Sequence, residues 1–400
     1  MKPTRARLGL MGSVAGLLGA RPALGLAEAP CFPANSRILA SWFPQDERAR
    51  ANSVYAVGQY VGLGFMLPVL GWITAMTRIL ALLLALAAPL TLFAQPIADQ
   101  APPADLAEKV RVMTEAAAAG GRGAFPAEMV SDPLLPTHTL YRPRDLAAAT
   151  RRAKLPIIAW GNGACANYGN RFRYFLTELA SHGYLILAIG PRGPQVVEWK
   201  VSLDPANPQP ASERLPGSYA AQLTDAIDWA LAENARRGGP YYRRLDPKAV
   251  AVMGQSCGGL QTISAAADRR VATAVVLNSG TFPADRRPLA GTGDATKASL
   301  RRIRVPTAWI SGDESDNAHA NSNADFAAFT NAPALHAWHR GTGHSVHYRE
   351  PHGGLFAPVV AAWLDWRLKR NGSAARTFTG PDCSLCKEPG WTVETKGFQP

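Results

Sequence analysis

The run Val250-Ala251-Val252-Met253-Gly254-Gln255-Ser256-Cys257-Gly258-Gly259 decides the predicted fold of this 400-residue chain. Its first four residues form the continuous apolar run of a buried strand. The glycines allow a turn that is too sharp and too crowded for side chains. Because an Ala-rich stretch follows, the run predicts a strand–turn–helix unit in which the hydroxyl of Ser256 projects above the end of a sheet.

Apolar runs and amphipathic stretches alternate on both sides of this unit. The order strand, helix, strand, helix predicts an α/β fold with a doubly wound, mostly parallel sheet, preceded by hydrophobic N-terminal segments. With the strand of this unit included, six strands are predicted, at residues 156–160, 184–189, 249–253, 272–277, 307–310 and 335–338. Helical spacing of apolar residues is found at residues 171–181, 219–234, 257–268, 323–329 and 355–369.

The G-x-S-x-G pattern at Ser256 predicts a nucleophile, which needs a base and an orienting acid later in the chain. A serine at a helix start can also be a simple N-cap. The polar loop Ser311-Gly312-Asp313-Glu314-Ser315-Asp316 follows one predicted strand, and Gly343-His344-Ser345-Val346-His347 follows the next. Carboxyl ends of strands are where ligand sites of open sheets lie. Asp316 and its rival Asp313, and His344 and its rival His347, are therefore the candidates.

The chain resembles the α/β-hydrolase superfamily from about residue 140 to residue 400, and more narrowly its dienelactone-hydrolase-like and polyester-hydrolase-like serine esterases. The resemblance rests on Trp160-Gly161-Asn162-Gly163-Ala164-Cys165, on Leu179-Ala180-Ser181-His182-Gly183-Tyr184, on the Ser256 run, on Gly312 to Asp316 and on Gly343-His344. It implies that Ser256 is the nucleophile, His344 the general base and Asp316 the acid that closes a Gly-x-x-x-Asp loop.

The resemblance also implies an oxyanion hole and a disulfide beside it. One backbone N–H would come from Cys257, and the second from Asn162 or Gly163 after the strand at 156–160. In this fold the two strands are neighbours, which predicts a Cys165–Cys257 disulfide; two free buried thiols are the alternative.

A second cysteine pair lies near the C-terminus, as Cys383-Ser384-Leu385-Cys386. A small structural disulfide is expected there, with a redox motif as the alternative. Five histidines at 336, 339, 344, 347 and 352 form a competing constellation that could ligate zinc. Their spacing is irregular and no H-E-x-x-H motif occurs, so no metal and no cofactor are expected.

The N-terminal region carries two uncharged apolar stretches, at residues 54–76 and 79–94. The first is long enough to span a bilayer. The second, after Met76-Thr77-Arg78, reads as a secretory signal peptide, with a second membrane helix as the alternative. The runs from Gly25 to Asn35 and from Trp42 to Ala51 resemble the sugar-acid symporters of the major facilitator superfamily. Predicted domains are therefore 1–75, a transporter-like fragment from a fusion or a misassigned start; 76–94, signal-peptide-like; and 95–400, α/β-hydrolase.

Composition and charge limit the partners. Lys+Arg number 42 and Asp+Glu 30, for a net charge of +12, but no long run of like charges occurs, so nucleic acid is not expected. The predicted activity is cleavage of carboxylic esters, small or polymeric, through a Ser-His-Asp triad and an acyl-enzyme. A non-catalytic or narrow-specificity protein acting on amides, lactones or polyesters, and a membrane-anchored fusion, are the alternatives. The location is secreted or periplasmic if translation starts at Met76, and membrane-anchored through contact by residues 1–94 otherwise.

Overall fold

A computed structural model of the chain divides it into two compact units, Met1–Asp99 and Gln100–Pro400. The structure describes residues 111–112, 114–116, 118–193, 217–283, 285–286, 288–345 and 347–398. The predicted membrane span, the signal-peptide-like segment and the domain boundaries at 75 and 94 lie outside these residues and stay predictions. Within the described ranges, no helix combines the length and the apolar character that crossing a membrane requires.

The described part of the second unit is built on one mixed sheet of nine strands in the order β1-β2-β4-β3-β5-β6-β7-β8-β9. The six strands from β4 to β8 in that order run parallel, and β1, β2 and β9 pair antiparallel at the two sides. The bounds are β1 Ala127–Ser131, β2 His138–Pro143, β3 Leu155–Gly161, β4 Leu185–Ile189, β5 Leu245–Gln255, β6 Thr273–Leu277, β7 Thr307–Gly312, β8 Ala334–His339 and β9 Trp391–Lys396.

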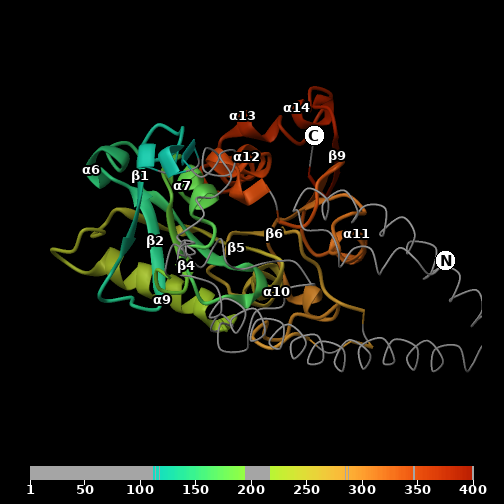
Figure 1. Ribbon diagram of the computed structural model, residues 1–400, viewed down its shortest axis with the longest axis horizontal. Coiled ribbons are helices and arrows are strands. Elements are labelled where there is room, and N and C mark those ends of the chain that lie inside the picture. Colours follow the sequence, from blue (N-terminus) through green and yellow to red (C-terminus); the bar gives the residue numbers. More distant parts are fainter. Residues whose placement is uncertain are drawn as a thin grey trace, which may run out of the picture. The chain divides into compact units, whose positions relative to one another are not determined.

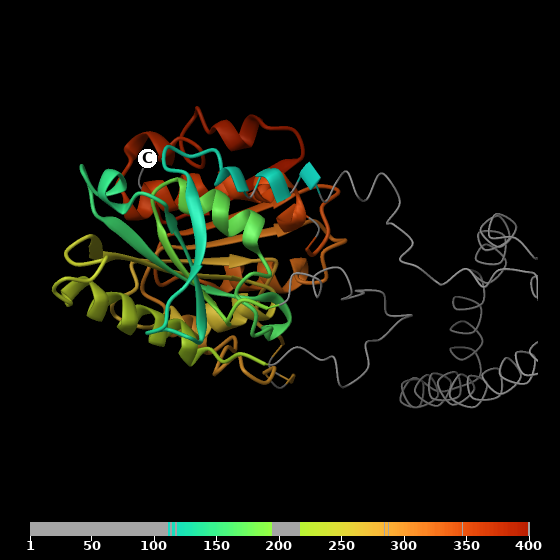
Figure 2. The same ribbon diagram turned by 60° about the vertical axis from the view of Figure 1, so that its left-hand side comes forward.

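Helices cover both faces of this sheet (Figures 1 and 2). The views place α7 and α12 on one face and α9 and α10 on the other. The bounds are α6 Leu146–Ala149, α7 Arg173–Ser181, α9 Ala221–Ala235, α10 Cys257–Ala265, α11 His319–Ala328, α12 Phe356–Leu368, α13 Gly372–Ala375 and α14 Ser384–Lys387. Short 3-10 turns are η1 Gly163–Cys165, η3 Ser299–Arg302, η4 His347–Arg349 and η5 Pro351–Gly353.

The two faces of the sheet carry two separate apolar cores, because successive strand residues point to opposite sides. In β3, Ile158 and Trp160 belong to the core under α7 and α12, whereas Ile157 and Ala159 belong to the core under α9 and α10. All four side chains are fully buried. A strand that is buried on both faces reads as a continuous apolar run, which is why β3 to β8 show no alternation in the sequence.

The chain order around β3 fixes where a site can form. From β3 the chain crosses to β4 on one side, and β5 then pairs with β3 on the other side. The loops that leave β3 and β5 therefore diverge and open a crevice at the carboxyl ends of these strands. Ser256 directly follows β5 and stands at this edge.

Candidate functional site

Ser256 occupies a strained turn between β5 and α10. Its φ is 55° and its ψ is −118°, a backbone conformation that side-chain-bearing residues rarely adopt. The flanking glycines make the turn sterically feasible. A Cβ on Gly254 would lie 2.4 Å from the carbonyl oxygen of Gly258, and one on Gly258 would lie 2.0 Å from the carbonyl oxygen of Gly161. The glycines of the motif are thus needed for helix α10 to approach β3 and β5 so closely.

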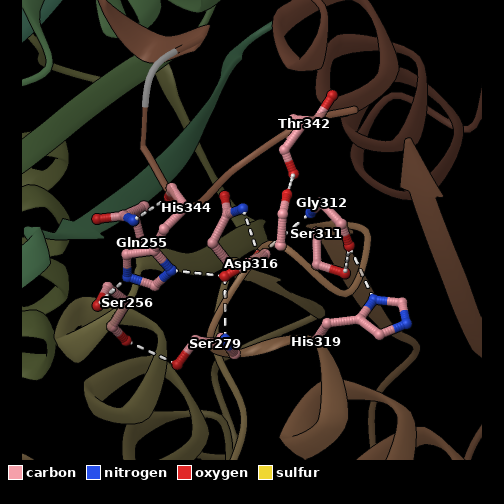
Figure 3. Close-up of polar contacts among 12 residues, drawn as sticks. Gln255, Ser256, Ser279, Ser311, Gly312, Asp316, His319, Thr342 and His344 are labelled. Atoms are coloured by element: carbon pink, nitrogen blue, oxygen red, sulfur yellow. Dashed lines mark hydrogen bonds and ion pairs between the residues drawn. The ribbon is translucent and has the colours of Figure 1, made fainter. Parts of the chain in front are cut away.

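Three side chains from three loops meet at the carboxyl edge of the sheet (Figure 3). The Nδ1 atom of His344 lies 2.7 Å from Oδ1 of Asp316, and its Nε2 atom lies 2.8 Å from Oγ of Ser256. Because a carboxylate only accepts, Nδ1 donates the hydrogen to Asp316, and Nε2 of the neutral ring then accepts from the Ser256 hydroxyl. The hydroxyl, the imidazole and the carboxylate form one continuous hydrogen-bonded chain.

Asp316 is held as a buried carboxylate, with only 2% of the residue exposed. Burial acts to raise the pKa of Asp316, but hydrogen bonds from His344, from the Ala318 amide and from Asn278 outweigh it and lower the pKa below its ordinary value. The Asn278 amide donates to Oδ2 at 2.8 Å. The carboxylate is therefore charged at neutral pH and can stabilise a protonated His344.

The rival residues Asp313 and His347 do not take part in the hydrogen bonds that join Ser256, His344 and Asp316. Asp313 instead accepts hydrogen bonds from the Ser315 hydroxyl at 2.7 Å and from the Gly341 amide at 2.5 Å. These bonds, the Ser315 hydroxyl first, lower the pKa of Asp313 to about 2. His347 lies 3.3 Å from a carboxylate oxygen of Glu350. Of the four candidates, the structure brings Asp316 and His344 to Ser256.

Two residues that hold His344 and Asp316 in place were not identified from the sequence. Gln255 is buried, and its amide donates to the carbonyl oxygen of His344 at 2.8 Å, which fixes the His344 loop over β5. Asn278 follows β6 and joins Asp316 to the hydroxyl of the buried Tyr348, which donates to Asn278 Oδ1 at 2.5 Å. Its place directly after a buried strand was the available signal, since polar residues at the carboxyl ends of parallel strands gather at ligand sites.

A cavity of about 280 Å³ opens beside the Ser256 hydroxyl. Its volume is close to the lower limit of small-molecule pockets, which bind ligands rather than macromolecular surfaces. Its walls come from the Ser256 turn and α10, from the segment after β6, from the loop after β7 with the start of α11, and from the His344 loop. The lining residues are Ser256, Cys257, Leu260, Asn278, Ser279, Gly280, Phe282, Arg286, Leu289, Asn317, Ala318, Asn321 and His344.

The predicted oxyanion donors divide into two groups. Cys257 lines the cavity and begins α10, where the first N–H groups of a helix have no partner within the helix. Asn162 is fully buried; its side-chain amide donates to the carbonyl oxygens of Ala166 and Ile189. Gly163 packs against Gln255, where a Cβ would lie 2.1 Å from the amide oxygen. Neither of these two residues lines the cavity.

The four cysteines of this unit are joined in two disulfides. Cys165 in η1 bonds to Cys257, 92 residues later, and so links the loop after β3 to the start of α10. Cys383 bonds to Cys386 at the N-terminal end of α14. The first disulfide therefore crosses the crevice directly beside Ser256.

The clustered histidines do not converge on one point. Each of the five has its own partner: His336 faces Ser322, His339 faces Thr342, His344 faces Asp316, His347 faces Glu350 and His352 faces Glu178. Among the described residues, no group of three potential ligands has the arrangement of a metal site. The five histidines thus lie beside five different partners in this part of the chain.

Comparison with known proteins relates the chain to transporters. Residues 7–184, fewer than half of the chain, match the Major Facilitator Superfamily. A D-galactonate transporter of Escherichia coli O6:H1 is 52% identical over 60 residues, which are 15% of this chain and 14% of the transporter. The probable galactarate/D-glucarate transporter GarP of Escherichia coli K12 is 51% identical over 51 residues, 13% and 12% of the two chains. The probable galactarate/D-glucarate transporter GudP of Bacillus subtilis is 43% identical over 58 residues, which are 14% of this chain and 13% of the transporter. The chain spans about a seventh of the length of these relatives.

These matches correct the predicted function. They bear out the resemblance of the N-terminal region to sugar-acid transporters of the major facilitator superfamily. They contradict a carboxylic ester hydrolase, a hydrolase-type protein acting on amides, lactones or polyesters, and an ester as the substrate, because the relatives are transporters of sugar acids. They are consistent with the membrane-anchored alternative and not with a secreted protein. Ser256, Asp316 and His344 lie outside the matched residues, so the roles of these three stay predictions.

Proposed function

We propose that the Gln100–Pro400 unit carries a nucleophilic serine, Ser256, with His344 as its base and Asp316 as the acid that orients the base. The observation that supports this proposal most directly is the hydrogen-bonded chain, with 2.8 Å between Ser256 and His344 and 2.7 Å between His344 and Asp316. Distances of this size are those of a nucleophile within reach of its base. The strained backbone of Ser256 is a second support, since such strain gathers at functional sites.

The same geometry gives the steps of the proposed attack. As Ser256 Oγ forms a bond to an electrophilic carbon or phosphorus, its proton moves to Nε2 of His344. The ring becomes an imidazolium, which the charged Asp316 stabilises through Nδ1–H. Negative charge that develops on the electrophile's oxygen would be met by the amide of Cys257 at the N-terminus of α10, where the helix dipole favours an anion. Asn162 or Gly163 is kept as the second proposed donor.

We propose for the same unit a fold of the α/β-hydrolase type. The six parallel strands, the helices on both faces and the Ser256 turn between β5 and α10 support this proposal. The fold by itself assigns no reaction, since one fold serves many functions.

Covalent labelling tests the proposed nucleophile. We expect a fluorophosphonate with a reporter group to form a bond to Ser256 Oγ with loss of fluoride, and the labelled peptide to be identified by mass spectrometry. Ser256→Ala removes the acceptor, whereas Ser264→Ala is a matched control on the same helix, where the hydroxyl bonds to Asp294. Label that persists in Ser256→Ala, or no label on folded wild-type protein, would overturn the proposal.

The comparisons support a second function, recognition of a sugar acid at a membrane. The names of the relatives describe transporters of D-galactonate and of galactarate or D-glucarate. The similar stretch is about half identical over 60 residues, which favours a shared origin for that segment. We therefore propose that the chain is located at a membrane through its transporter-like region and that it binds or moves a sugar acid there.

This second function is tested with the full chain. We expect the protein to stay in the membrane pellet after an alkaline carbonate wash, and proteoliposomes that contain it to take up or retain radiolabelled D-galactonate above protein-free vesicles. The proposal fails if the chain is released by carbonate and the vesicles retain no more galactonate than the protein-free control.

A further inference from the structure

The cavity beside Ser256 carries a positive charge that the proposed attack does not use. Among the described residues that line it, Arg286 is the one side chain with a permanent charge, and no carboxylate lines the wall. The guanidinium lies 5.1 Å from the centre of the Phe282 ring, which also lines the cavity. Contact with an aromatic face favours a cation and limits its freedom. Arg286 is exposed to solvent and also lines the cavity, so its charge is available to a ligand there.

Arg286 differs in its partners from three arginines of the same unit that pair with carboxylates within the protein. Arg236, Arg270 and Arg302 each form ion pairs with carboxylates, namely Glu233, Asp268 and Asp294. Within the described ranges, the guanidinium of Arg286 forms no ion pair and no hydrogen bond, whereas the backbone N–H of Arg286 donates to the carbonyl oxygen of Pro283. A guanidinium fork has five N–H donors in a geometry that matches a carboxylate in two parallel hydrogen bonds. An acidic group in the cavity would supply the kind of partner that Arg236, Arg270 and Arg302 have within the protein.

Two amides extend the polar wall of the cavity. Asn317 and Asn321 line it from the loop after β7 and from α11, and no residue of the described part hydrogen-bonds to their side chains. Asn278 is different, because it already donates to Asp316 and accepts from Tyr348. Each free amide offers both donors and an acceptor, which suits hydroxyl groups that are themselves donors and acceptors.

We infer that this cavity binds a small polyhydroxy carboxylate, with the carboxylate on Arg286 and the hydroxyl groups on Asn317 and Asn321. The cavity volume of about 280 Å³ limits the ligand to a small molecule. The inference rests on the proposed function in one respect: it names the class of ligand that lies beside Ser256. It does not depend on whether Ser256 attacks that ligand.

Calorimetric titration of the full-length protein tests this inference with two probes that differ in charge. Gluconate carries a carboxylate and hydroxyl groups, and sorbitol is its neutral counterpart. We expect gluconate to bind at least tenfold more tightly than sorbitol, and its affinity to fall as ionic strength rises, because salt screens an exposed charge pair. Equal affinity for the two probes, or no heat with millimolar gluconate, would overturn the inference.

Substitutions locate the binding. We expect Arg286→Gln to weaken gluconate binding about tenfold, the size typical of losing a charge-assisted hydrogen bond at an accessible site. Arg286→Lys should recover part of the loss, because it keeps the charge without the fork. Arg237→Gln is the matched control at an exposed position outside the cavity and should change the affinity less than twofold. If Arg286→Gln binds gluconate as wild type does, the inference is wrong.

Failure of the proposed nucleophile is read from a different experiment. Fluorophosphonate labelling measures the reactivity of the Ser256 hydroxyl, and titration of the Arg286 variants measures how far gluconate binding depends on Arg286. If gluconate binding depends on Arg286 but Ser256 is not labelled, the inferred binding cavity stands and the proposed nucleophile is wrong. If Ser256 is labelled but gluconate binding does not depend on Arg286, the proposed nucleophile stands and the inferred binding cavity is wrong.

Discussion

Removing the Cys165–Cys257 disulfide should destabilise the Gln100–Pro400 unit far more than removing Cys383–Cys386. The first bond joins residues 92 apart, and the second joins residues 3 apart. In the chain-entropy model, a cross-link stabilises the fold by restricting the unfolded chain, and the effect grows with the logarithm of loop length. The model gives about 4.6 kcal/mol for the long loop and about 1.6 kcal/mol for the short one at 25 °C.

The assay compares Cys165→Ala/Cys257→Ala with Cys383→Ala/Cys386→Ala by guanidinium unfolding, followed through tryptophan fluorescence under oxidising conditions. We expect free energies of unfolding that differ by about 3 kcal/mol between the two double variants. The matched pair controls for the loss of two sulfur atoms. If the Cys383/Cys386 variant is destabilised as much as the other, loop closure is not how these disulfides act.

Further predictions concern the buried histidine, the acid and the glycines. Burial first, and the charge of a neighbouring histidine second, lower the pKa of His336 to about 3. Because the unfolded residue takes up a proton near pH 6.5, the stabilisation should be fully present above that pH, and the free energy of unfolding should fall by about 2 kcal/mol by pH 5. His336→Leu should flatten this dependence when unfolding curves at pH 7 and pH 5 are compared. Asp316→Asn should slow fluorophosphonate labelling about a thousandfold or more, whereas Asp313→Asn should leave the rate within twofold; equal rates in the two variants would refute the assignment of the acid. Gly258→Ala should abolish the native fold near the site, since its Cβ would lie 2.0 Å from a backbone oxygen, whereas Gly372→Ala, with open space around it, should raise the melting temperature slightly.

The inner strands could be predicted from the sequence because burial on both faces leaves an unbroken apolar run. The runs at 156–160 and 307–310 lie inside β3 (Leu155–Gly161) and β7 (Thr307–Gly312). The outer strands could not be found in this way. β9 has the sequence WTVETK and is only partly buried, so that it resembles a polar loop until β8 pairs with it. Outer strands depend on a neighbour rather than on their own hydrophobicity.

The candidate site could be predicted in its order along the chain but not in its geometry. Asp313 and Asp316 occupy one loop, and their difference is the direction of the side chain: Asp316 turns inward to Asn278 and His344, and Asp313 turns outward to Ser315. Such a difference arises from packing that short-range patterns do not contain. The predicted ester hydrolysis was wrong for another reason, since it was drawn from the Ser256 motif, the loops with Asp316 and His344 and a family resemblance, while the matched residues point to sugar-acid transporters.

The measurement that tests the central claim most directly is the rate of fluorophosphonate labelling of the full chain, with the modified residue located by mass spectrometry. We expect one labelled peptide, modified at Ser256, with labelling that is lost in Ser256→Ala and unchanged in Ser264→Ala. Modification of a different residue, or labelling of Ser256→Ala at the wild-type rate, would contradict it.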